Sequence, residues 1–183
     1  MLIRSQRLVV TGEEFTEPMT LAIAKSHCRI DSSDEDTYLA DIITRARQES
    51  EGLCGRRFGS QSWRLTFDAF DLVKLIGCGS ILEVTKVQYR STDGAWVDIS
   101  PSQYELISTV PAKIKFFSSF SNPAAVEFSE KLRVDLKCGD PLDGGARSWN
   151  LLRIASLFEN RDTPPEPSEF MTHLLDAQRI TLF

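Results

Sequence analysis

The chain has 183 residues, of which 42% are hydrophobic and 26% are charged, and it includes 11 Phe, 3 Trp and 3 Tyr. This length and composition are typical of a folded soluble protein with its own core, and they exclude a chain that is mainly disordered. The formal net charge is -5 and the pI is about 5.1, so no overall positive field attracts nucleic acid. We therefore do not expect a general DNA-binding protein.

The cysteines and the N-terminus point to a reducing compartment. Cys28, Cys54, Cys78 and Cys138 are far apart and form no C-x-x-C pair, so we expect free thiols and neither a zinc site nor a cofactor. No apolar run resembles a signal peptide or approaches the roughly 20 residues that span a bilayer. The sequence thus predicts a cytoplasmic protein that does not contact membranes.

The first elements in chain order are an extended segment and a short helix. Residues 8–10 are apolar enough for a short strand or an extended arm. Thr20 is the expected N-cap of a helix of about two turns, because it precedes apolar residues at helical spacing. These residues are Leu21, Ala24 and Cys28.

A second, longer helix is predicted after residue 31. Ser32 and Glu35 have the spacing of a capping box, and Gly55 is suited to a left-handed C-cap. One stripe of this helix is apolar and requires a packing partner. The stripe consists of Tyr38, Leu39, Ile42, Ile43, Ala46, Leu53 and Cys54.

From residue 62 to about 137 the hydrophobic period changes to two, which predicts strands. The alternation is clearest at 63–67 and 132–137, and the Asp93-Gly94 step between 87–89 and 95–97 suits a hairpin turn. Further short strands are expected at 104–107, 113–116 and 124–128. The sequence therefore predicts an antiparallel region of five to seven strands.

Helical spacing returns after the glycine-rich loop at 139–145. Leu151, Ile154, Ala155 and Phe158 share one face and form a natural partner for the second helix. The proline-rich run 163–167 ends this helix, and a last short helix is expected around 170–175.

Together these patterns predict an α+β fold, in which a small helical bundle is interrupted by an inserted antiparallel sheet region. We expect five segments along the chain. They are an N-terminal arm at 1–19, helical core at 20–60, the β region at 61–140, further helical core at 141–162, and a linker with a docking tail at 163–183.

No pattern in the sequence favours catalysis. His27 and His173 lack partners at ligand spacing, and the carboxylates Asp68 and Asp71 are more simply explained as turn residues than as a hydrolase pair. The turn at 77–80 holds a thiol and a hydroxyl with no recognisable base, and the loop at 139–145 lacks the Lys-Ser/Thr of a phosphate loop. We therefore expect no catalytic or metal-binding residues.

Several stretches, taken in order, resemble the head-tail connector (adaptor, or head-completion) proteins of long-tailed phages and gene transfer agents. These stretches are LAIAKSHCRI at 21–30, DED at 34–36, GRRF at 55–58, QSWRL at 61–65 and LFENR at 157–161. The resemblance implies a bundle of the first, second and penultimate helices, elaborated by the sheet. It also implies a ring, commonly of twelve copies, in the virion neck, where the chain contacts the portal protein and a tail-side completion or stopper protein while DNA passes without specific binding.

The C-terminal segment is the candidate docking element. Its apolar residues follow a proline-rich linker, so they can bury against the portal or a neighbouring subunit, although folding back over their own core explains them equally well. The candidate docking residues are Leu174, Leu175, Ile180, Leu182 and Phe183.

A nucleic-acid-binding module is the alternative interpretation. Such a module would stack bases on sheet aromatics and contact phosphates through local arginines. The aromatics are Trp63, Tyr89, Trp96 and Tyr104, and the arginines are Arg4, Arg7, Arg56 and Arg57. A hydrolase that uses Asp68 and Asp71 is a third interpretation.

Overall fold

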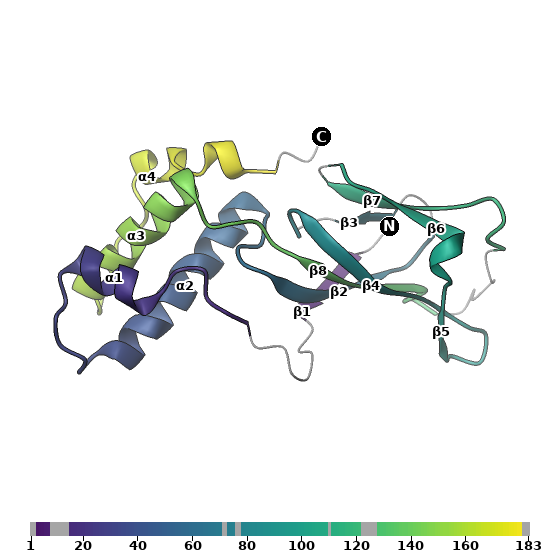
Figure 1. Cartoon of the computed structure of the whole chain (residues 1–183), viewed down its shortest axis with the longest axis horizontal. Helices are drawn as coiled ribbons and strands as arrows, with labels where there is room; N and C mark the ends of the chain where they lie inside the picture. Colours follow the sequence, from purple (N-terminus) through teal and green to yellow (C-terminus); the bar gives the residue numbers. More distant parts are fainter. Residues whose placement is uncertain are drawn as a thin grey trace. The chain divides into compact units, whose positions relative to one another are not determined.

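The computed structural model describes the backbone of residues 3–7 and the whole of residues 15–70, 73–75, 78–109, 111–121 and 128–180. The chain divides into two compact units. The helical unit comprises 15–59 and 140–181, and the β unit comprises 1–14 and 60–139. Helices and antiparallel sheets are thus segregated, and the predicted α+β class is confirmed (Figure 1).

The helical unit contains α1 (Leu21–Cys28), α2 (Asp36–Cys54), α3 (Gly144–Glu159) and the short α4 (Glu169–His173), followed by a 3-10 turn at Asp176–Gln178. Thr20 caps α1 as predicted, because its side-chain oxygen accepts a hydrogen bond from the Ile23 amide at 3.3 Å. Gly55 ends α2 in the left-handed conformation, with φ of 66°, also as predicted.

The predicted capping box of α2 is wrong. The helix begins at Asp36, with Glu35 at the N-cap position and no side-chain capping bond. The carboxylates of this segment bind cations from other elements instead. Glu35 accepts a hydrogen bond from Arg161 at 2.5 Å, and Asp36 accepts one from Lys25 at 2.7 Å. These tertiary ion pairs replace the local box.

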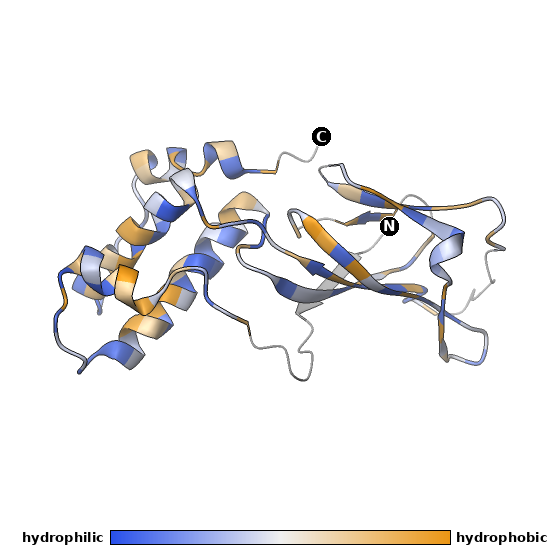
Figure 2. Ribbon diagram, viewed as in Figure 1, coloured by the Kyte–Doolittle hydropathy of each residue, from blue (hydrophilic) through white to orange (hydrophobic). Residues whose placement is uncertain are grey.

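The core of the helical unit lies between α1, α2 and α3, so the predicted pairing of the second helix with the later one is confirmed. Hydrophobic and hydrophilic residues alternate along these helices (Figure 2). The first part of the predicted α2 stripe packs on Ile154 and Leu157 of α3, with Met19 and Ala24 completing the cluster. The buried members from α2 are Leu39, Ile42, Ile43 and Ala46. Leu53 was wrongly assigned to the stripe, because its side chain is 45% exposed, and Cys54 is buried in a separate cluster.

The β unit contains two antiparallel sheets, and seven of its described strands lie between residues 61 and 138, in agreement with the predicted antiparallel region. One sheet has the strand order β1-β2-β8-β4-β5, and the other has the order β3-β7-β6. The strands of the first sheet are β1 (Ile3–Arg7), β2 (Gln61–Phe67), β8 (Leu132–Cys138), β4 (Ile81–Arg90) and β5 (Trp96–Asp98). Those of the second are β3 (Val73–Leu75), β7 (Ala112–Phe116) and β6 (Tyr104–Ile107), and a 3-10 turn at Pro101–Gln103 precedes β6.

Strand register explains the core of the β unit. In the central pair, Leu65 lies opposite Val134 and Phe67 lies opposite Leu132, and all four side chains are buried. The predicted hairpin at Asp93-Gly94 is confirmed, since it joins β4 to β5 and Gly94 has φ of 88°. Of the predicted strand at 124–128, only Phe128 is described, and the predicted strand at 8–10 lies outside the described residues.

Candidate assembly surfaces

A buried charge network shapes the N-terminal half of the helical unit. Arg47 of α2, which is 2% exposed, donates two hydrogen bonds to Glu17 at 2.8 and 2.9 Å and pairs with Glu51 at 3.0 Å. Burial by itself lowers the pKa of Arg47, but the hydrogen bond to Glu17 and the charge of Glu51 outweigh it and raise that pKa. Glu51 also accepts a hydrogen bond from the Phe58 amide at 2.9 Å. This network fixes the chain on both sides of α2.

A second polar group joins α2 to α3. Arg153 donates to Glu49 at 2.6 Å and to the Pro165 carbonyl at 2.6 Å, so it links both helices to the proline-rich run. Burial alone raises the pKa of Glu49, yet hydrogen bonds from Arg153 and Arg45 lower it overall. Nearby, Asn150 donates to Ser50 at 2.9 Å in a fully buried site. These contacts hold the helices in register.

The C-terminal segment folds onto the helical unit. Leu175 is fully buried in a cluster with Cys54, Phe58, Ala146 and Trp149, and Leu174 is half-buried beside it. The Ile180 amide donates to the Cys54 carbonyl at 2.9 Å, and Arg56 donates to the Gln178 carbonyl. Leu182 and Phe183 lie outside the described residues. Leu175 therefore contributes to the core of its own unit, and the docking role of the segment stays a prediction.

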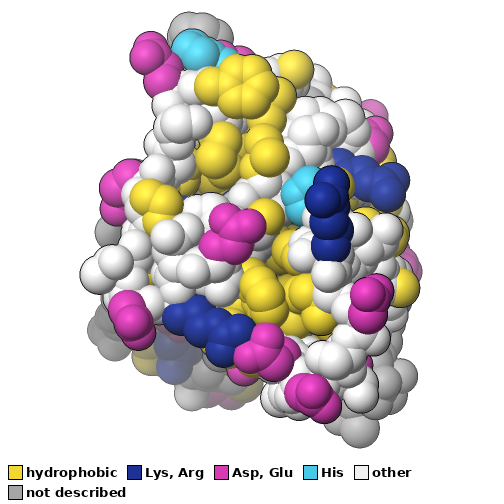
Figure 3. Space-filling view, turned by 90° about the vertical axis from the view of Figure 1, so that its left-hand side faces the viewer, with side chains coloured by type: hydrophobic (Ala, Val, Ile, Leu, Met, Phe, Trp, Pro, Cys, Tyr) yellow, Lys and Arg dark blue, Asp and Glu magenta, His cyan; other side chains and the backbone are white. Residues whose placement is uncertain are grey.

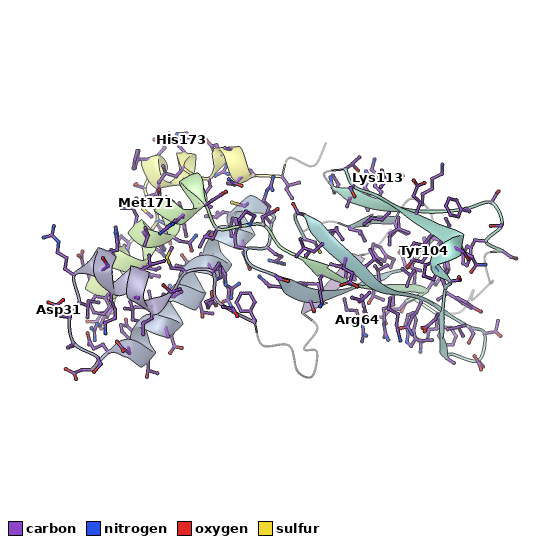
Figure 4. All side chains as sticks on the ribbon, viewed as in Figure 1. Asp31, Arg64, Tyr104, Lys113, Met171 and His173 are labelled. Atoms are coloured by element: carbon purple, nitrogen blue, oxygen red, sulfur yellow. The ribbon has the colours of Figure 1, made fainter. Side chains whose placement is uncertain are left out.

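Among the described residues of this segment, Phe170 is the most exposed large apolar side chain, with 68% of its surface accessible. It stands in α4, which Ser168 caps through a hydrogen bond from the Met171 amide at 3.3 Å. Figure 4 shows Met171 directed toward α3 and His173 directed away from it. Apolar side chains also interrupt the charged surface at the end of the helical unit (Figure 3). The sequence signal for Phe170 was its place just after the proline run and the serine cap.

Two of the four arginines proposed for the nucleic-acid alternative, Arg56 and Arg57, form ion pairs within the helical unit. Arg56 pairs with Asp140 at 3.0 Å, and Arg57 lies 3.6 Å from Glu51. Three of the four proposed stacking aromatics, Trp63, Tyr89 and Tyr104, pack against the β core. Figure 4 places Tyr104 between the two sheets. The side chains of Arg4 and Arg7 are not described, although β1 pairs with β2.

Trp96 belongs to a different environment on the outer face of the five-stranded sheet. The Arg133 guanidinium lies 4.0 Å from the Trp96 ring centroid, and the Arg90 guanidinium lies 4.2 Å from that of Phe128. Burial and the neighbouring charge of Arg64 lower the pKa of Arg133. Sequence analysis missed this group, although Arg90 and Trp96 flank the predicted hairpin closely enough to suggest a cross-strand pair.

The residues considered for catalysis do not come together as a site. Of the Asp68 and Asp71 pair only Asp68 is described, Cys78 is buried, and His27 and His173 are both exposed. Within the described residues, no group of three or more His, Cys, Asp or Glu side chains is placed to hold a metal ion. No helix in the described part of the chain is long and apolar enough to cross a membrane.

A small groove beside α2 has a volume of about 180 Å³. Binding pockets for small molecules are commonly about 300 Å³ or more, so this groove is small for such a ligand. It is lined by Tyr38, Asp41, Ile42, Arg45, Leu157, Arg161 and Pro164.

The fold and its surfaces define a small α+β protein whose helical unit is assembled from two separated stretches of chain. Residues 18–91 match the model of the phage gp6-like head-tail connector protein family, which confirms the resemblance to that family over this part of the chain. No curated protein matches the sequence.

Solved structures of the same fold come from gene transfer agent (GTA) particles. A chain from the neck of an empty GTA particle, computed with C6 symmetry, is 17% identical with a TM-score of 0.78. A chain from the virion of a native GTA particle is 17% identical with a TM-score of 0.76, and one from a native GTA neck computed with C12 symmetry is 15% identical with a TM-score of 0.73. Each match covers 100% of this chain and 97% of the other. At these identities the likeness establishes the fold.

Proposed function

We propose that this chain is a structural head-tail connector in the neck of a tailed phage or phage-like particle. The observation that carries the proposal is the family match over 18–91 together with a full-length fold shared with chains from GTA particles. In this function, copies form a ring between the portal and the tail, and the ring extends the DNA channel. A connector acts by holding a fixed shape within the ring, so the helix packing described above is the property on which this function depends.

Charge supports passage of DNA rather than its capture. The helical unit carries 15 acidic and 10 basic side chains, whereas the β unit carries 11 of each. An acidic surface repels phosphates, so a channel lined in this way does not hold the DNA. Arg56 and Arg57 are paired with carboxylates, which further weakens any attraction of the protein for DNA phosphates.

Docking through the C-terminal segment forms a second part of the proposal. Since Leu175 is buried in its own unit, the exposed Phe170 is the residue of this segment best placed to contact the portal or a neighbouring subunit. Leu174, Ile180, Leu182 and Phe183 would extend that contact. An exposed aromatic side chain of this size is a common anchor at protein interfaces.

Particles that lack this chain provide the test. Heads without tails, or heads that leak DNA, are expected in its absence, and the wild-type protein should restore tailed particles. Tailed particles that form normally without the chain would contradict the connector function.

Substitution of Phe170 by Ser tests the docking contact. It should leave the monomer folded but prevent restoration of tailed particles. The matched control is Leu53→Ser, which alters an apolar side chain of α2 that is 45% exposed and should restore them. If the Phe170 variant fully restores tailed particles, the proposed docking role of Phe170 is wrong.

A further inference from the structure

Two arginines on the outer face of the five-stranded sheet lie over aromatic rings. Arg90 lies opposite Trp96 in the β4–β5 register, and Arg133 lies on the neighbouring strand β8, opposite Gln88. Besides the two stacking contacts above, the Arg90 guanidinium lies 5.6 Å from the Trp96 ring. We call Arg90, Trp96, Phe128 and Arg133 the arginine–aromatic patch. Strand pairing sets the positions of Arg90, Trp96 and Arg133, whereas Phe128 precedes β8 and lies outside the paired strands.

The neighbouring charges are largely neutralised, whereas the patch is not. Arg64 makes a two-pronged pair with Asp135 at 2.6 and 2.7 Å, and Figure 4 shows Arg64 on the side of its sheet away from the second sheet. Asp98 accepts a hydrogen bond from Gln88 at 2.7 Å and lies 3.6 Å from Lys86. These pairs account for the charges of Arg64 and Lys86.

Arg133 and Arg90 retain unused donors. The Arg133 Nε atom is buried without a hydrogen-bond acceptor among the described residues, and Arg90 uses its Nε on the Gly94 carbonyl at 3.2 Å. The charges that act on Arg133 include the cations Arg64 and Arg90 and the carboxylates Asp135 and Glu130. Both side chains are only half-buried overall, so the patch offers an anion the terminal N–H groups of the two guanidinium groups rather than the buried Nε of Arg133.

This arrangement suits carboxylates better than nucleic acid. A guanidinium group is planar and presents paired N–H groups, which match the two oxygens of a carboxylate. Strong binding of DNA needs several neutralised phosphates, yet the β unit as a whole has no excess of basic residues. A short acidic protein segment is therefore the expected partner.

The chain carries such a segment in the turn between α1 and α2. Asp31 and Asp34 are exposed there, while the adjacent Glu35 and Asp36 are engaged by Arg161 and Lys25. Figure 4 shows Asp31 in this connection, and we call residues 31–34 the acidic turn. A ring of identical subunits needs two different, complementary surfaces on each copy, and the patch and the turn have opposite charge.

We propose that the arginine–aromatic patch of one copy binds the acidic turn of a neighbouring copy. The proposal rests on the ring-forming function proposed above and names a contact between its subunits. In this contact Asp31 and Asp34 accept hydrogen bonds from Arg133 and Arg90. The aromatic rings beneath the guanidinium groups limit their side-chain motion, so less conformational entropy is lost on binding.

Photo-crosslinking in assembled particles identifies the occupant directly. A photo-reactive amino acid replaces Gln88, which lies beside Arg133 on the outer face. Particles are assembled from equal parts of isotopically light and heavy chains, so mixed-mass crosslinks report contacts between copies. Crosslinks to residues 29–36 of another copy are expected. Crosslinks mainly to DNA, to a different protein or within the same copy would overturn the proposal.

Charge exchange tests whether the contact matters for assembly. The patch variant Arg90→Glu with Arg133→Glu, and the turn variant Asp31→Arg with Asp34→Arg, should each lower the number of copies per particle at least tenfold. Carrying all four substitutions in one chain should restore most of the copies. The control Lys113→Glu, on β7 of the other sheet, should change nothing.

The outcomes separate this inference from the function on which it rests. If the patch variant is incorporated at the normal copy number, the proposed subunit contact is wrong. The contact is also wrong if the four-substitution variant does not regain its copies and the wild-type crosslink to residues 29–36 is absent. Neither result contradicts the connector function. Wild-type particles with no copies at the neck contradict the connector function itself. Circular dichroism of each purified variant confirms that the chain is folded, and the crosslinking experiment retains both arginines.

Discussion

Arg153 of α3 and Glu49 of α2 form an ion pair at 2.6 Å in which the arginine side chain is 6% exposed and the glutamate side chain is 29% exposed. The same arginine donates to the Pro165 carbonyl, so one side chain ties together two helices and the segment that leads to α4. The C-terminal segment thus depends on the helical core for its position. Substitutions at these contacts should therefore change the free energy of unfolding of the helical unit, which can be measured.

Substitution of Arg153 by Ala should destabilise the helical unit by about 2 kcal/mol, because it leaves a partly buried carboxylate and a carbonyl without their donor. Urea unfolding followed by far-UV circular dichroism measures the change. Arg45→Ala is the matched control, since Arg45 pairs with the same Glu49 but is 55% exposed. That control should cost less than about 1 kcal/mol. Equal losses in the two variants would contradict a special role for Arg153.

The same pair predicts how stability depends on pH. The pKa of Glu49 is lowered in the folded chain, so its contribution is complete above the ordinary glutamate pKa of about 4.3 and is lost as the pH falls through the folded value. Wild-type protein should therefore lose stability on acidification to about pH 3, and Glu49→Gln should lose less over the same range. Urea titrations of both proteins at several pH values measure the free energy of unfolding. If it falls equally with pH in the two proteins, the pair does not make the predicted contribution.

Leu175→Ala should lower the free energy of unfolding by about 3 kcal/mol, since it empties a fully buried position among Cys54, Phe58 and Trp149. Phe170→Ala, in the same segment but largely exposed, should change stability by less than about 0.5 kcal/mol. Thermal unfolding of both variants separates the core residue from the proposed docking residue. A stable Leu175 variant would mean that the segment is not part of the core.

Gly145, in the first turn of α3, lies against the backbone of the C-terminal segment. A Cβ atom there would stand 1.9 Å from the Leu174 carbonyl oxygen, so Gly145→Ala must displace that backbone and should cost about 2 kcal/mol. Gly52→Ala is the control, because nothing lies within 4 Å of its Cβ position in α2. It should stabilise the helix by roughly 0.5–1 kcal/mol. Denaturant unfolding of both variants measures these changes. Midpoints of the two variants that shift in the same direction would contradict the close approach of Gly145 to the Leu174 backbone.

Thiol reactivity provides a probe of folding for both units. Cys54, Cys78 and Cys138 are buried, and burial raises the pKa of Cys54 to about 11. Cys28 is only half-buried, although burial also raises its pKa. A thiol-reactive dye at about pH 8 should therefore label Cys28 slowly and the other three hardly at all, with all four labelled in denaturant. Rapid labelling of Cys78 or Cys138 in the native protein would contradict the β core.

Local signals in the sequence predicted much of the fold. Thr20 and Gly55 act within one turn of their own helices, so their capping roles are visible without tertiary structure. The period-two alternation at 63–67 and 132–137 likewise reports directly which side chains face the core. The capping box at Ser32 and Glu35 failed for the opposite reason. Glu35 pairs with Arg161, which follows α3, so a residue distant in the sequence binds the carboxylate that the box requires.

The assembly surfaces were harder to predict because they depend on register and on long-range packing. An apolar tail after prolines looks the same whether it folds back or projects, and only the structure separates the buried Leu175 from the exposed Phe170. Arg133 and Trp96 are 37 positions apart in the sequence. They meet only because β8 and β5 both flank β4.

Cryo-electron microscopy of the neck in complete particles tests the central claim most directly. The account predicts a closed ring of density between the head and the tail, in which each repeat accommodates the helical unit and the β unit of one copy. Particles made without the chain should lack that ring. A neck whose density is complete in the absence of this chain, or copies of the chain found only elsewhere in the particle, would contradict the connector function.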